Sequence, residues 1–288
     1  MHLQIRRHLV QLAATALYNL NGAAISIAGK GINFDINKAC VPGLNCQYCR
    51  YSVAGCPLGI AQLTAAGKIS NIFATAYGLI ILFALLLGRV VCGWGCPMGF
   101  LQDLLDKVPL PKIKKNSFTY YLSYLKYIIL AVFVIILPYY TGIGKFQGIN
   151  TFCQWLCPGN FLESAFLPNI WRMDVDNLII AMHNTKFVWT MLLLAISAII
   201  YRPFCRFLCP LGAFYSFFNK FSLLGIKVDT SKCIGCNACV RKCKMDVKKV
   251  GDHECISCGL CKGICPKQAI YFKCTSKQNA QLRKDDVH

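Results

Sequence analysis

Two closely spaced runs of cysteine near the C-terminus constrain the fold of this chain most strongly. In each run, three cysteines stand at every third position and a fourth comes four positions later: Cys233, Cys236, Cys239 and Cys243, then Cys255, Cys258, Cys261 and Cys265, followed by Pro266. Bacterial ferredoxins hold two [4Fe–4S] clusters with this spacing, each bound by three cysteines of one run and the fourth of the other. The sequence therefore predicts one cluster on Cys233, Cys236, Cys239 and Cys265, and a second on Cys255, Cys258, Cys261 and Cys243.

Zinc is the alternative occupant of a four-thiolate site. Zinc sites built on C-x2-C pairs lack the third closely spaced cysteine, so the spacing favours iron–sulfur clusters. One departure is that Lys244, not proline, follows Cys243, which makes Cys243 the less typical of the two crossed ligands. Cys274 lies outside both runs, and we expect it to be a free thiol.

The chain upstream of these runs is unusually apolar. Hydrophobic residues make up 56% of the 288 positions, more than in ordinary soluble domains. Four apolar stretches, near 8–28, 71–91, 120–140 and 187–204, approach the length of about 20 residues that a helix needs to cross a bilayer. Basic residues precede the first stretch, as in a signal peptide, but no small-x-small cleavage site follows it, so we expect a retained helix.

Lysine and arginine are concentrated in two segments, Arg89–Lys126 and the chain from Arg202 onward. By the positive-inside rule both segments are expected in the cytoplasm, with loops 29–70 and 141–186 outside. The sequence thus predicts a multi-pass protein of the cell (inner) membrane with both termini cytoplasmic. The formal charge of +19 could suit nucleic acid, but no DNA- or RNA-binding motif accompanies it. We expect the lipid bilayer and acidic protein partners instead.

The two halves of the apolar region repeat one pattern, in which cysteine motifs alternate between membrane faces in step with the helices. At the predicted inner face, each half carries one C-x3-C-P motif: Cys92 and Cys96 in the first, Cys205 and Cys209 in the second. We expect the proline to end the preceding helix and the glycine after it to let the chain turn away sharply. Four converging thiolates suit one further iron–sulfur cluster. The alternative, a pair of disulfides, is disfavoured in a reducing cytoplasm.

Six more cysteines fall in the predicted outer loops: Cys40, Cys46, Cys49 and Cys56 in the first, and Cys153 and Cys157 in the second. The repeat pairs the second-loop cysteines with Cys56, which also precedes Pro-Leu-Gly, and with Cys49 in an outer cluster. Cys40 and Cys46 then form a disulfide, remain thiols or bind something else. Alternatively, the first loop supplies all four ligands, or the outer cysteines form structural disulfides in an oxidising exterior.

These observations predict a mainly α membrane protein with a small α+β module at its end. Residues 1–222 are expected to form a membrane domain of four transmembrane helices in two internal repeats. Residues 223–275 are expected to form a cytoplasmic bacterial-ferredoxin-like 2[4Fe–4S] domain, and residues 276–288 a polar tail. None of the five histidines lies in the middle of a predicted helix, so a haem held by two helical histidines is not expected. No glycine-rich dinucleotide motif, P-loop or hydrolytic triad is recognisable either.

Four parts of the chain resemble the NapH/MauN-type family of ferredoxin-like membrane proteins, and most closely its 4Fe–4S binding members in anaerobic bacteria. They are the double cysteine run, Val41–Cys46 (VPGLNC), Val91–Pro97 (VCGWGCP) and Tyr201–Pro210 (YRPFCRFLCP). The resemblance implies four transmembrane helices, two cytoplasmic C-x3-C-P motifs, and electron transfer involving quinol or a partner redox protein. The outer cysteines depart from the simpler nitrate-reductase-associated members and better suit an electron route that reaches the far membrane face.

Electron transfer is the function that this arrangement predicts. A cytoplasmic ferredoxin or flavodoxin-like protein is expected to dock on the basic module, where cationic side chains flank the cluster motifs at Arg241, Lys242, Lys244, Lys248 and Lys249. Electrons then pass to the inner cluster and on to a membrane quinone or an outer-face redox protein, as in a subunit of a quinol dehydrogenase or another oxidoreductase complex. The alternative is an iron–sulfur assembly, metal-delivery or redox-sensing protein without turnover.

The thickness of the bilayer limits the transmembrane route. Its apolar core spans about 30 Å, and the interiors of the predicted helices hold no cysteine or histidine that could support a relay. An electron therefore reaches the outer cysteines only if the outer motifs dip inward, or if a quinone or a partner subunit bridges the gap.

Overall fold

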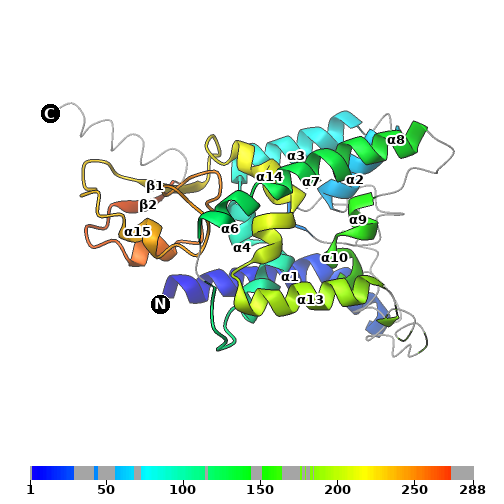
Figure 1. The fold of residues 1–288 in the computed structure, drawn as a ribbon, viewed down its shortest axis with the longest axis horizontal. Coiled ribbons are helices and arrows are strands. Elements are labelled where there is room, and N and C mark those ends of the chain that lie inside the picture. Colours follow the sequence, from blue (N-terminus) through cyan, green and yellow to red (C-terminus); the bar gives the residue numbers. More distant parts are fainter. Residues whose placement is uncertain are drawn as a thin grey trace.

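A bundle of helices carries a small module with two β-strands at one end (Figure 1). The computed structural model describes residues 2–28, 42–44, 56–67, 73–113, 116–143, 151–163, 176, 179, 182–183 and 185–273. Cys40, Cys46, Cys49, Cys274 and the predicted polar tail lie outside the described residues.

Helices occupy all four of the apolar stretches identified in the sequence. They are α1 (His2–Ala28), α3 (Phe73–Leu87), α13 (Thr185–Ile199), and the run α6 (Ser117–Leu122), α7 (Leu125–Ile129), η2 (Leu130–Ile136) and α8 (Leu137–Ile143). Within the described residues, one helix, Phe118–Gly142, is long and apolar enough to cross a membrane, whereas α13 is apolar but shorter. Four membrane crossings therefore remain a prediction.

In the bundle, each proline of a Cys-Pro pair begins a short helix. These helices are α2 (Pro57–Ala65), α5 (Pro97–Leu105), α10 (Pro158–Phe161) and α14 (Pro210–Phe218), and the residue before each is an extended cysteine. Proline suits the first helical position because its φ is already helical and its missing N–H is not needed there. The expected sharp turn at the following glycine is wrong, since Gly99 and Gly212 lie inside α5 and α14. The second cysteine of each motif thus sits at a helix N-terminus.

Three shorter helical segments carry the first cysteines of the C-x3-C-P motifs. They are α4 (Val90–Trp94), α9 (Thr151–Trp155) and the π-helical turn η4 (Phe204–Leu208). In Figure 1, α4 lies on the side of the bundle nearer the β-containing module, whereas α2 and α9 lie farther from it. Around the inner motif, α5 packs against both α1 and α13.

The C-terminal module has the α+β form expected of a ferredoxin. Strand β1 (Gly225–Val228) pairs antiparallel with β2 (Ile270–Lys273), with Gly225 opposite Lys273. The cysteine runs between the strands contain two single-turn elements, α15 (Ala238–Arg241) and the 3-10 helix η5 (Leu260–Gly263). Each is preceded by a left-handed residue, Asn237 and Gly259, which turns the loop tightly.

Buried ion pairs fix the module against the bundle. Glu254 accepts hydrogen bonds from Arg89 (2.7 Å) and Lys126 (2.5 Å), and all three side chains are buried. Asp246 of the module likewise pairs with Arg206 at 2.5 Å. Because an unpaired buried charge is strongly destabilising, these pairs specify one docking position.

Candidate functional site

The four cysteines of the two inner C-x3-C-P motifs surround one small enclosed cavity. Each is buried, with exposed fractions between 6% and 9%. The prolines and helix starts described above bring them together from α4, α5, η4 and α14: Cys92, Cys96, Cys205 and Cys209. In the described part of the chain, no three His, Cys, Asp or Glu side chains converge closely enough to bind a single metal ion. The four thiols are instead arranged around a shared space.

Hydrogen-bond donors point at the sulfur atoms of this inner set. The Gln102 carboxamide donates to Cys205 Sγ at 3.1 Å, and the Gly212 N–H donates to Cys209 Sγ at 3.4 Å. Burial raises the pKa of the Cys96 thiol to about 12, although backbone N–H groups of Gly99 and Leu44 act in the opposite direction. A buried thiolate therefore needs a cation, and the iron of a cluster supplies one. The donor set fits an iron–sulfur cluster.

The structure also brings together the first crossed set of the module. A cavity of about 180 Å³ is lined by four cysteines, three from the first run and the last from the second: Cys233, Cys236, Cys239 and Cys265. Cys233 and Cys236 are exposed, and the other two are half-buried. This cluster site therefore faces solvent.

The second crossed set faces the bundle. Burial raises the pKa of the Cys261 thiol to about 12, together with the nearby charges of Cys255, Cys258, Cys243 and Cys239. Cys243 and Cys258 line a cavity with Arg7 of α1, and Gln4 of α1 donates to the Cys258 carbonyl at 3.1 Å. The cysteines of the first crossed set thus line one outward cavity, those of the second lie near one another on the side of the helices, and the crossed ligand assignment stays a prediction.

The inner cysteines and the second crossed set meet at a direct backbone contact. Gly93, which follows Cys92, lies so close to the carbonyl oxygen of Ile256 that a Cβ at this glycine would overlap it. Ile256 follows Cys255 in the sequence. Beside this contact the Trp94 indole donates to the Ser257 carbonyl at 2.9 Å. Residues adjacent to a cysteine of each site are therefore in contact.

Three of the six outer cysteines can be placed, and all three are buried: Cys56, Cys153 and Cys157. Leu44 lies between the inner set and the surroundings of Cys157. Leu44 lines the inner cavity. On its other side it lies against Gly159: a Cβ built on this glycine would stand 3.3 Å from Leu44 Cδ2 and 3.7 Å from Cys157 Sγ. One leucine side chain therefore lies between the inner cavity and the surroundings of Cys157.

Two functional residues were missed in the sequence, Gln62 and Gln102. Each is fully buried and donates to a cysteine sulfur, Gln62 to Cys153 at 3.2 Å. Their position could have revealed them, because each lies six residues after the cysteine of a Cys-Pro pair, Cys56 or Cys96.

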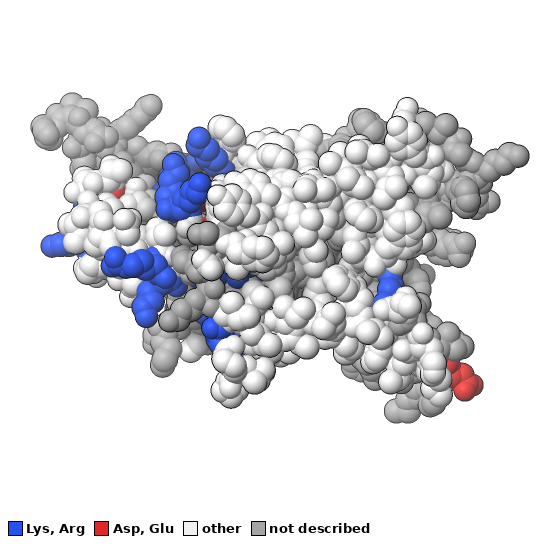
Figure 2. All heavy atoms as spheres, in the orientation of Figure 1, with Lys and Arg blue, Asp and Glu red and all other residues white. Residues whose placement is uncertain are grey.

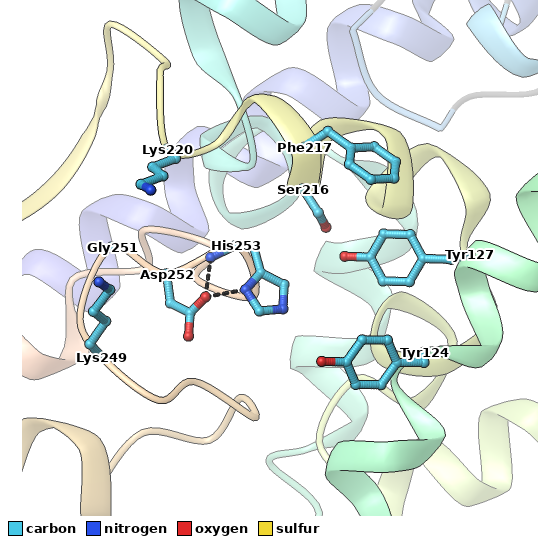
Figure 3. Close-up of a pocket in the computed structure, with 9 residues that line it drawn as sticks. All are labelled: Tyr124, Tyr127, Ser216, Phe217, Lys220, Lys249, Gly251, Asp252 and His253. Carbon is cyan, nitrogen blue, oxygen red and sulfur yellow. Dashed lines mark hydrogen bonds and ion pairs between the residues drawn. The ribbon is translucent and has the colours of Figure 1, made fainter.

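A separate pocket of about 650 Å³ lies between the bundle and the module. Figure 3 shows its lining, in which the hydroxyl groups of Tyr124 and Tyr127 point toward the loop that carries His253. Phe217 adds an apolar side, and His253 pairs with Asp252. This loop leads directly into Cys255, so the pocket adjoins the second crossed set.

The basic residues of the module form part of a basic surface at the junction between module and bundle (Figure 2). Figure 2 shows lysine and arginine concentrated over the module and its junction with the bundle, whereas this face of the bundle beyond is almost free of charge. Lys244 pairs with Asp106 of the bundle at 2.5 Å, and Lys248 lies over the Tyr120 ring. The remaining residues of the predicted docking set are exposed: Arg241, Lys242 and Lys249.

Family models agree with the position of these sites. A model described as a 4Fe-4S binding domain matches residues 71–116 and 186–229, which contain both inner motifs, and a second model of the same description matches residues 226–249. No solved structure matches the chain.

Several curated proteins are similar over most of the chain. The uncharacterized protein MJ0750 of Methanocaldococcus jannaschii is 31% identical over 231 residues, covering 77% of this chain and 87% of that protein. The ferredoxin-type protein NapH of Haemophilus influenzae is 28% identical, covering 75% and 74%. The methylamine utilization ferredoxin-type protein MauN of Methylorubrum extorquens is 28% identical, covering 65% and 54%. The chain therefore belongs to the NapH/MauN-type family of ferredoxin-like proteins.

Proposed function

We propose that this protein is a membrane-embedded iron–sulfur conduit that carries single electrons from a cytoplasmic donor toward the opposite membrane face. The order of sites follows from exposure and contact. The first crossed set faces solvent and meets the partner, the second faces the bundle, and the inner four cysteines come next. The contact between Gly93 and Ile256 carries this proposal, because it joins the last two sites without an intervening layer of side chains.

The surface of the bundle supports a membrane location with several crossings. Large apolar side chains are exposed along three helices: Leu82 and Leu85 on α3, Ile128 and Ile135 on the Phe118–Gly142 helix, and Val188 and Leu192 on α13. Contiguous apolar surface of this kind is rarely left to water. The apolar surface suits a bilayer around the bundle, and the basic surface at the module end suits a module in the cytoplasm.

The outer cysteines extend the route beyond the inner cluster. Cys56, Cys153 and Cys157, with a fourth cysteine of the first loop, hold a further cluster in this proposal. Leu44 supports the step, because it lines the inner cavity and also lies against Gly159, beside Cys157. An outer-face redox protein then receives the electron.

Anaerobic purification followed by iron and sulfide counting tests the cluster inventory. We expect about 16 irons per chain, four per cubane. The double variants Cys92→Ser/Cys205→Ser and Cys56→Ser/Cys153→Ser should each lose about four irons, whereas Cys274→Ser, outside all four sets, should lose none. A count near eight irons, unchanged in both double variants, contradicts the proposal because it leaves clusters only in the module.

Transport itself is tested in proteoliposomes that contain trapped ferricyanide, with reduced bacterial ferredoxin added outside. The native protein should reduce the trapped ferricyanide, and the Cys92→Ser/Cys205→Ser variant should not. Absence of reduction by the native protein with all clusters present would favour an assembly or sensing role instead.

A quinone is the second candidate acceptor, and the 650 Å³ pocket is the observation that favours it. Its size is typical of small-molecule sites, and its lining combines aromatic side chains with polar and charged groups that could bind a carbonyl oxygen. A naphthoquinone added to the reduced protein should oxidise the second crossed cluster. Phe217→Trp, which fills the pocket, should slow this step, whereas Phe221→Trp at an exposed position should not. Equal oxidation rates in the two variants would exclude this pocket as the quinone site.

A further inference from the structure

Gln62 and Gln102 occupy equivalent places in two sites far apart in the sequence. Each lies on the helix that begins at the proline of a Cys-Pro motif, α2 and α5 respectively. Each reaches across to the first cysteine of the C-x3-C-P motif in the other half of the chain, Cys153 for Gln62 and Cys205 for Gln102. The N···S distances are 3.2 Å and 3.1 Å.

Hydrogen bonds fix which end of each carboxamide faces the sulfur. The backbone N–H of Phe152 donates to Gln62 Oε1 at 3.0 Å, and that of Phe204 donates to Gln102 Oε1 at 3.1 Å. Because each Oε1 already accepts this hydrogen bond, the NH2 group is the end that faces the cysteine.

The NH2 group then has two N–H bonds and two acceptors. In both sites one goes to a backbone carbonyl of the same helix, Leu58 for Gln62 and Met98 for Gln102, each at 3.1 Å. The other goes to sulfur. Both glutamines are fully buried, so a buried N–H is satisfied only if the sulfur accepts it well. A thiolate is a much better acceptor than a neutral thiol or a disulfide sulfur.

We propose that Gln62 and Gln102 are matched positioning residues, each of which holds one cluster-binding thiolate and raises the reduction potential of the cluster bound there. The inference rests on the inner and outer clusters of the proposed function. An N–H donated to a ligand sulfur stabilises the reduced cluster more than the oxidised one, because the added electron increases the negative charge on sulfur. The step is a one-electron reduction, with no bond or proton transferred. The arrangement also specifies a thiolate site, not a disulfide, at Cys153.

Two substitutions at each glutamine test the proposal. Gln62→Glu and Gln102→Glu keep the shape and the acceptor for the phenylalanine N–H but remove the N–H donors. Gln62→Met and Gln102→Met keep the length without hydrogen bonds or charge, and remain informative if the glutamate variants fail to fold. Iron and sulfide are counted first, and midpoint potentials are then measured by redox-titrated EPR on the full-length protein, with signals assigned by the cysteine variants described above.

We expect each substitution to lower the midpoint potential of one cluster only. At a fixed solution potential, the ratio of reduced to oxidised cluster should fall about tenfold, which equals a shift of about 59 mV in the midpoint potential for one electron. Variants at Gln102 should lower the midpoint potential of the inner cluster and leave that of the outer cluster unchanged. Variants at Gln62 should do the reverse. If the glutamines had a merely structural role, each substitution would disturb the inner and outer clusters equally.

The result that overturns the proposal is a full iron count with unmoved potentials in both methionine variants. Shifts of both signals together by either single variant also overturn it. If the native protein shows an inner cluster but no outer one, the outer part of the proposed function fails. The inference then fails for Gln62, and Gln102 is judged by its own variants. The two failures are therefore distinguishable.

Discussion

Gly93 lies against the carbonyl oxygen of Ile256, so that the peptide between two inner cysteines touches the peptide next to Cys255. Any other residue at position 93 has a Cβ that would overlap this oxygen. The contact is therefore available only to glycine, and it sets how closely the module approaches the inner site.

Gly93→Ala should push the module away from the inner site and slow electron transfer between them. The clusters themselves should remain, because no cysteine changes. The measurement is the rate at which the inner EPR signal appears after reduced ferredoxin is added, with Gly78→Ala as control, since a Cβ at Gly78 meets no atom within 4 Å. We expect at least a tenfold slowing, equivalent to about 1.4 kcal/mol in the barrier. Equal rates in the two variants contradict the assigned contact.

Glu254→Gln should destabilise the docked module, because Arg89 and Lys126 then stay buried without a carboxylate. Removing one partner of a buried pair costs about 3–5 kcal/mol, so the melting temperature should fall by at least about 6 °C. Asp229→Asn is the control, because Asp229 is paired only with neighbouring exposed residues of the module among the described contacts. A melting temperature equal to that of the control contradicts the prediction.

The stabilisation by Glu254 should depend on pH in the acid range. Burial raises the pKa of this carboxyl, but the charges of Arg89 and Lys126 lower it by more, so it lies below 4.5. A group with a lowered native pKa contributes fully above its unfolded value and loses that contribution as the pH falls through the native value. The difference in melting temperature between the native protein and Glu254→Gln should therefore shrink as the pH falls below about 5. A difference that grows toward acid pH contradicts this sign.

Leu44→Ala should slow electron exchange between the inner and outer clusters. The substitution leaves a cavity where the leucine fills the space between the two sites, and it costs about 2–5 kcal/mol of stability. Leu193→Ala on α13 is the matched control, since this leucine is equally buried, at 3% exposed, but does not line the inner cavity. Leu44→Met, which conserves volume, should restore most of the rate. If both alanine variants slow exchange equally, Leu44 has no special place in the route.

Iron chelation under mild oxidation should remove the clusters in order of exposure. Cys233 and Cys236 are exposed, whereas the inner cysteines are buried. We expect about four irons to be lost first, together with the EPR signal assigned to Cys233 and its partners. Early loss of the inner signal would contradict the burial described above.

The sequence predicted what short-range spacing determines. The helices in the four apolar stretches follow from local composition, and the meeting of Cys92 and Cys96 with Cys205 and Cys209 follows from a repeated motif. The crossed ligand assignment in the module and the four membrane crossings stay predictions. The sharp turn expected after the two inner Cys-Pro pairs was predicted wrongly, because a proline can begin a helix as readily as end one.

Features that depend on which segments pack together could not be read from the sequence. Gln62 and Gln102 are ordinary helix residues until a cysteine from the other half of the chain stands beside them. Leu44 was noticed only as part of a family motif. Its place between two sites depends on the path of residues 42–44 into the bundle, which no local pattern specifies.

The buried inner cysteines also bear on how the protein is made. Once Glu254 is locked onto Arg89 and Lys126 and Ile256 rests on Gly93, the inner thiols are covered on the module side. For the proposed conduit, we therefore expect iron and sulfide to reach the inner cysteines while the C-terminal segment is still undocked. Biogenesis then has a preferred sequence, in which the inner site is loaded first and the module closes over it afterwards.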